Sequence, residues 1–84
     1  MNVNELCAVQ RRLTNDLAKH GATSHFVVVE AMAASYVDNI SYQVMVLPHY
    51  GLPPEPRFCK RGNDLAVLEM HAAEFIETTH WRKS

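Results

Sequence analysis

The residues of this sequence that are best suited to chemistry are five histidines and two cysteines. Glu77-Thr-Thr-His80 has the i, i+3 spacing that places a carboxylate and an imidazole on one side of a helix, and His71 with Glu74 has the reverse order. Carboxylate-bridged metal sites of this kind take their ligands from four helices and use the motif twice. The chain has one copy, so we interpret these residues as a solvated helix face and expect no metal ligand and no cofactor.

The cysteines and the known catalytic motifs give no sign of an enzyme. Cys7 and Cys59 lie far apart without a CxxC spacing, so we expect both to be reduced and buried as small hydrophobic residues. A nucleophilic cysteine would need a base and an orienting group nearby, and none is identifiable beside Cys7. No glycine-rich phosphate loop, His-Glu-x-x-His motif or nucleophile elbow occurs. The sequence therefore predicts no catalytic residue and a protein that is not an enzyme.

A cluster of cations precedes the second predicted helix, and a helix N-terminus offers free backbone N–H groups to an anion. The candidate anion or nucleic-acid contacts are Arg57, Lys60 and Arg61, with Arg11, Arg12 and Lys19 on the first predicted helix. The formal net charge of −1 adds no general attraction to nucleic acid. The alternative interpretation is that these cations only solubilise the surface.

A third group of candidate functional residues consists of apolar residues that the core of a monomer does not need. Two helices cannot cover both faces of a sheet, and exposed Trp, Met and Tyr side chains are typical of protein interfaces. The candidate partner or dimer interface is Val67, Met70, Trp81, Met45, Leu47 and Tyr50. In the alternative interpretation, the proline-rich segment folds back over these residues.

Composition and patterning predict one domain that spans residues 1–84. Hydrophobic residues make up 48% and charged residues 20% of the chain, which is typical of a folded globular protein. Leu6, Val9, Leu13 and Leu17 recur at helical spacing and predict a helix over about residues 3–20. Asn2 and Glu5 form a capping-box-like start, and Gly21 follows at the stop. A second helix is predicted over about residues 63–81, with Asn63 as N-cap and Asp64 in the first turn.

The middle of the chain is rich in β-branched and aromatic residues, which predicts strands over about residues 25–34 and 40–47. In the second strand, Tyr42, Val44 and Val46 alternate with Gln43, Met45 and Leu47, so the two sets lie on opposite faces. A helix over residues 30–37 is the alternative to the end of the first strand, because its apolar residues also fit a 3.6-residue period. The proline-rich segment 48–56 predicts an extended surface connector, and residues 57–60 can add an edge strand.

These elements predict a small two-layer α+β domain with a β-hairpin, or a three-stranded antiparallel meander, between two helices. In element order it resembles the double-stranded RNA-binding domain, which uses basic residues at the start of its last helix to contact phosphates. The resemblance covers the element order alone: the lysine-rich run of that family is replaced by Asp64-Leu-Ala-Val67, and its histidine motif in a β-turn has no counterpart.

We therefore expect a small non-enzymatic binding or regulatory protein that acts through protein–protein contacts, as a homodimer. The outline is typical of small accessory proteins, those of phages and mobile elements included. The alternative function is a nucleic-acid-binding module. The N-terminus carries neither a basic region nor an apolar stretch of leader type, so we expect a cytoplasmic protein without membrane contact.

Overall fold

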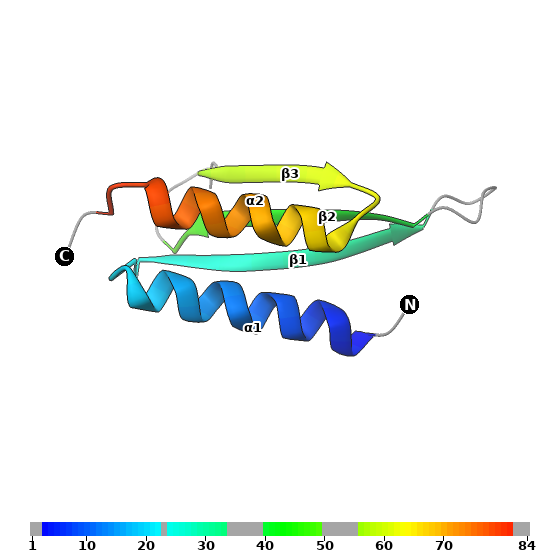
Figure 1. The fold of residues 1–84 in the computed structure, drawn as a ribbon, viewed down its shortest axis with the longest axis horizontal. Helices are drawn as coiled ribbons and strands as arrows, with labels where there is room; N and C mark the ends of the chain where they lie inside the picture. Colours follow the sequence, from blue (N-terminus) through cyan, green and yellow to red (C-terminus); the bar gives the residue numbers. More distant parts are fainter. Residues whose placement is uncertain (1–2, 23, 34–39, 50–55, 82–84) are drawn as a thin grey trace.

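The structure is a computed structural model that describes residues 3–22, 24–33, 40–49 and 56–81. The elements follow in the order α1 (Val3–Lys19), β1 (His25–Ala33), β2 (Ile40–Pro48), β3 (Phe58–Gly62) and α2 (Leu65–Thr78), as drawn in Figure 1. The predicted α+β architecture of helix, three-stranded antiparallel meander and helix is confirmed. No helix in the described part of the chain is long and apolar enough to cross a membrane.

The end of α1 follows from a glycine that adopts a left-handed backbone conformation. Gly21 has a φ of 71°, which a residue with a side chain rarely adopts. Its N–H donates to the carbonyl of Ala18 at 3.1 Å, and the N–H of Ala22 donates to the carbonyl of Leu17 at 2.8 Å. This pair of bonds satisfies carbonyls that the helix end would otherwise leave free. The predicted stop at Gly21 is confirmed, whereas the predicted cap at Asn2 lies outside the described residues.

The sheet has the order β1-β2-β3 with antiparallel neighbours. Residues 30–33 belong to β1, so the alternative helix is wrong for this part of the chain, and residues 34–37 lie outside the described residues. The edge strand predicted over residues 57–60 is present as Phe58–Gly62. In the register, Val44 lies opposite Val29 on one side and Lys60 on the other, and this pairing decides which side chains share a face.

The second helix begins and ends at other residues than the sequence predicted. Asp64 is the N-cap in place of Asn63, because its backbone is extended and its carboxylate accepts the N–H of Ala66 at 3.1 Å. The helix ends at Thr78, three residues before the predicted limit. Thr79 leaves the helical conformation, and both its N–H and its hydroxyl donate to the carbonyl of Phe75.

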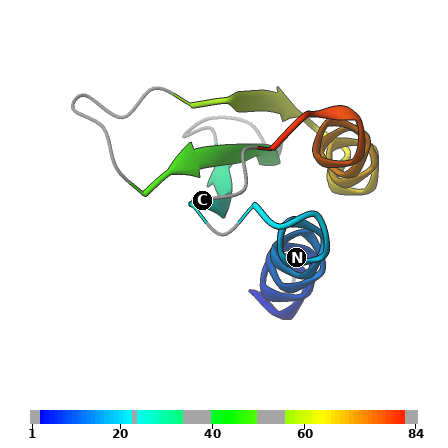
Figure 2. The same cartoon turned by 90° about the vertical axis from the view of Figure 1, so that its left-hand side faces the viewer.

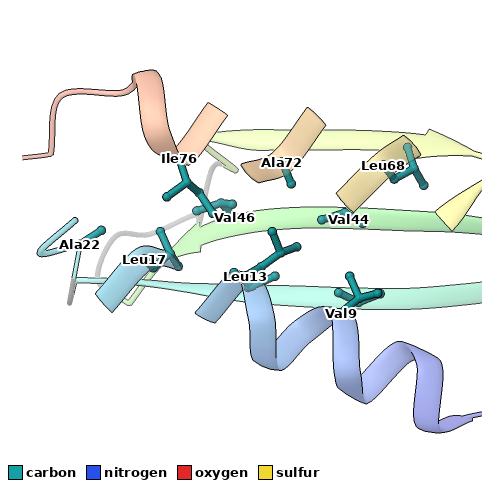
Figure 3. Close-up of a cluster of buried hydrophobic side chains, with 11 residues drawn as sticks. Val9, Leu13, Leu17, Ala22, Val44, Val46, Leu68, Ala72 and Ile76 are labelled. Atoms are coloured by element: carbon teal, nitrogen blue, oxygen red, sulfur yellow. The ribbon is translucent and has the colours of Figure 1, made fainter. Parts of the chain in front are cut away.

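Both helices pack on the same face of the sheet. Figure 2 shows them on one side of the strands, with α1 against β1 and α2 against β2 and β3. Figure 3 shows that their apolar stripes meet Val44 and Val46 of β2, and Val27 and Val29 of β1 belong to the same core. The core residues are Val9, Leu13, Leu17, Ala22, Val27, Val29, Val44, Val46, Leu68, Ala72 and Ile76. Neither of the two described helices lies on the other face of the sheet.

Candidate functional site

The face of the sheet that points away from the helices is the candidate site, and we call it the open face. Side chains alternate along each strand, so the neighbours of the buried valines in sequence point to this side. Its residues are Phe26, Val28, Glu30 and Met32 of β1, Ser41, Gln43, Met45 and Leu47 of β2, and Cys59 and Arg61 of β3. The open face therefore mixes an apolar majority with one carboxylate and one guanidinium.

One half of the open face is apolar. Phe26 lies opposite Leu47, and Val28 lies opposite Met45, which in turn lies opposite Cys59. Phe26 is 37% exposed, and the other three large side chains are only partly buried by their neighbours in the sheet. At the end of this half, the ring of His49 lies against that of Phe26 with 5.0 Å between centroids. No described element covers these residues.

A polar row crosses all three strands next to the apolar half. Glu30 lies opposite Gln43, and Gln43 lies opposite Arg61. The Nε of Arg61 donates to Oε1 of Gln43 at 2.8 Å, which holds the guanidinium over the sheet. The amide nitrogen of Gln43 contacts the sulfur of Met45 at 2.9 Å, and these contacts leave Gln43 only 8% exposed. Glu30 is exposed and forms no ion pair within the described part of the chain.

The residues of the predicted interface lie on separate surfaces of the molecule. Met45 and Leu47 lie on the open face, whereas Val67 and Met70 lie on α2, which packs on the opposite side of the sheet. Val67 is 39% and Met70 59% exposed, so they form a small apolar patch on that helix. Tyr50 lies outside the described residues.

Trp81 is partly buried in an aromatic cluster next to the core. Its indole N–H donates to the carbonyl of Ile76 at 2.9 Å, which folds the chain after α2 back onto the helix. Its ring meets the rings of His25 at 4.9 Å and Phe75 at 6.0 Å, and the guanidinium of Arg57 lies 5.6 Å from its centroid. These contacts within the chain cover much of the apolar surface of Trp81, which was the reason for predicting it in an interface.

The cluster also perturbs a histidine. Burial lowers the pKa of His25 below its ordinary value, and the charges of Arg57 and His49 lower this pKa further. The hydroxyl of Ser24 lies 3.0 Å from Nδ1 of His25. His25 shares the helix-covered side of β1 with Val27, so it closes one end of the core and lies apart from the open face.

The predicted cations do not form one continuous surface. Lys60 and Arg61 point to opposite faces of β3, and Arg57 lies over Trp81. Arg12 donates twice to the carboxylate of Glu69 on α2, at 2.6 and 2.8 Å, and these bonds raise the pKa of Arg12. The remaining two, Arg11 and Lys19, are exposed on α1.

The proposed anion position at the start of α2 is blocked by a carboxylate. Asp64 already accepts the backbone N–H of Ala66, one of the free donors that an anion would use. A phosphate at this helix end would therefore meet a negative charge at hydrogen-bonding distance from the same N–H group.

The residues that could do chemistry stay dispersed. Among the residues that the structure describes, no three His, Cys, Asp or Glu side chains gather into a possible metal site. Glu74, Glu77 and His80 are exposed, and Nδ1 of His71 is buried without a hydrogen-bond partner in the described chain. The prediction of buried cysteines is wrong: Cys7 and Cys59 are both free and exposed, because one lies on the outer side of α1 and the other on the open face.

Two shallow hollows mark the helical side of the molecule, and neither gathers a catalytic set. One lies on the outer surface of α1 and is lined by Cys7, Gln10, Arg11, Thr14 and Asn15. The other lies between the helices, where the Arg12–Glu69 pair bridges it, and its lining also includes Glu5, Ala8, Val9, Leu65 and Ala66.

Comparisons with protein-family models, characterised proteins and solved structures found no match.

Sequence reasoning missed Val28, Glu30 and Cys59 as parts of the candidate site and assigned Arg61 to anion binding. The alternation of β2 was recognised, so Met45 and Leu47 were found. The partners of these residues depend on the strand register, which pairs positions 13 to 21 residues apart in the chain, such as Gln43 with Glu30 and Leu47 with Phe26. The alternation of β2 was the available signal, because the residues of β1 and β3 that pair with Gln43, Met45 and Leu47 must lie on the same face of the sheet.

Proposed function

We propose that this protein is a non-enzymatic binding protein that docks onto another protein chain through its open face. The observation that carries the proposal is the placement of both helices on one side of the sheet, so that no described element covers Phe26, Val28, Met45 and Leu47. Contiguous apolar surface of this kind marks association sites in proteins.

The energetics favour a protein partner. Fully burying a side chain of the size of Met or Phe stabilises by about 1.5 to 3 kcal/mol, and the apolar half of the open face gains part of this amount at each of its residues on docking. Phe and Met are enriched in protein interfaces. The dispersed cations and the carboxylate of Asp64 lend no comparable support to a nucleic-acid ligand.

Site-specific photocrosslinking tests the proposal. We expect a photoreactive benzophenone amino acid in place of Met45 to form covalent adducts with protein, either with the purified chain itself or with a protein in an extract of the native host. Met70 provides a matched control, because it is the same residue type, it is exposed, and it lies on α2. Adducts from position 70 but none from position 45 would overturn the proposal.

A further inference from the structure

We propose that the chain on the open face is a second copy of this protein, related by a two-fold axis parallel to β2. In this dimer Glu30 faces the partner's Arg61, and Arg61 faces the partner subunit's Glu30. The inference rests on the proposed function and names the partner of the same face. It is carried by the pattern of charge and apolar residues over the three strands.

The two charges of the open face do not pair with each other within one copy of the described chain, and a second copy can pair with both. They belong to the same row, with Gln43 between them. Neighbouring strands lie about 4.8 Å apart, so the backbones of Glu30 and Arg61 are separated by about 10 Å. The guanidinium bonds to Gln43 at 2.8 Å, and Glu30 has no ion-pair partner in the described chain.

A two-fold axis parallel to the strands exchanges the outer strands. It passes over β2, so β1 of one copy lies above the partner's β3, while each row of residues stays at the same height along the strands. The dimer then contains two Glu30–Arg61 pairs, one on each side of the axis. An axis across the strands would place β1 above β1 and β3 above β3, so the unlike charges would never face each other.

The apolar half supports the same axis. The rows that contain Phe26 with Leu47, and Val28 with Met45 and Cys59, both lie on one side of the charged row. An axis parallel to the strands keeps these rows in place, so apolar rows of the two copies cover each other and Met45 approaches its own copy at the axis. Sheets that pack face to face with nearly aligned strands are common and lie about 10 Å apart.

Charge reversal tests this arrangement. We expect the wild-type chain to form a dimer in sedimentation velocity, and Glu30→Arg or Arg61→Glu alone to weaken dimerisation by roughly tenfold or more, because each creates two like-charge contacts. An equimolar mixture of the two variants should recover a dimer of wild-type strength, since both contacts become attractive again. The double variant, with both changes in one chain, should also dimerise.

A matched pair of variants controls for net charge. Arg11→Glu and Glu74→Arg change the charge by the same amounts at exposed positions on the helices. Each should dimerise like the wild type, alone and in mixture. Because recovery in the mixed Glu30→Arg and Arg61→Glu sample is a gain of association, a failure of either variant to fold cannot produce it.

The outcomes separate this inference from the proposed function. A mixture that associates no better than the single variants overturns the two-fold arrangement. A wild-type chain that stays monomeric at high micromolar concentration, while position 45 crosslinks to a different protein, overturns the second copy and leaves the proposed function standing. A wild-type chain that stays monomeric, together with adducts from position 70 but none from position 45, overturns both.

Discussion

The two faces of β2 show how differently neighbouring residues of one strand can be used. Val44 and Val46 are fully buried, whereas Met45 and Leu47 alternate with them and keep part of their surface exposed. All four are apolar, so hydrophobicity alone does not distinguish them. The difference arises because α1 and α2 both pack on the valine side. The covered face therefore stabilises the fold, and the open face is the one that we propose for association.

The largest expected effect is a difference in the free energy of unfolding between two Leu→Ala substitutions, one on each side of the sheet. Leu13→Ala removes a fully buried side chain from α1 and should lower the free energy of unfolding by about 3 kcal/mol, because it leaves a cavity in the core. Leu47→Ala on the open face should cost about 1 kcal/mol at concentrations where the chain is monomeric. Urea denaturation followed by circular dichroism measures both. Equal losses would contradict the division into two faces.

A second comparison tests whether Trp81 stabilises the fold or serves association. Trp81→Ala removes the hydrogen bond to Ile76 and the ring contacts with Phe75 and His25, and it should lower the free energy of unfolding by about 2 kcal/mol. Met70→Ala on the exposed side of α2 should change it by less than about 0.5 kcal/mol. If Trp81→Ala left stability unchanged and weakened dimerisation, the sequence-based assignment of Trp81 to an interface would be correct.

The smallest expected effect is a pH dependence of stability that arises from His25 at the end of the covered face. The lowered pKa of His25 means that, as the pH falls through about 6.5, the unfolded chain takes up this proton before the folded one does. The contribution of His25 to stability is therefore complete above that pH and is lost as the pH falls toward the lowered folded pKa. His25→Phe, which keeps an aromatic ring, should reduce the fall in urea midpoint between pH 7.5 and 5.5.

An NMR titration of His25 in the folded protein checks the same point directly. Its midpoint should lie below the ordinary value of 6.5, because burial and the charge of Arg57 disfavour the imidazolium form. A midpoint at or above 6.5 would show that the ring is open to solvent. The packing of His25 against Trp81 would then be wrong.

Much of the fold was predictable from local patterns. The helical spacing of Leu13 and Leu17, the glycine at position 21 and the alternation around Val44 depend on neighbours within a few residues, so they are visible in the sequence. The N-cap of α2 was predicted one residue too early, since Asn63 and Asp64 are adjacent and either can cap a helix. The structure uses Asp64, whose carboxylate reaches the N–H of Ala66.

The candidate site was only partly predictable, because its residues come from three strands. The sequence determined that more apolar surface exists than two helices can cover, and it identified Met45 and Leu47 on the strand with the clearest alternation. It also grouped them with Val67 and Met70, which the fold places on another side of the molecule. Spacing along one element carries no information about which side of a sheet that element will pack on.

The sequence by itself therefore determined the elements and an excess of apolar surface, since both depend on local spacing and composition. The tertiary structure decided that both helices share one face, that Trp81 packs within the chain, and that Glu30 and Arg61 lie in one row across Gln43. These outcomes depend on strand register and on the choice of face for each helix, which are set by contacts between residues distant in the chain.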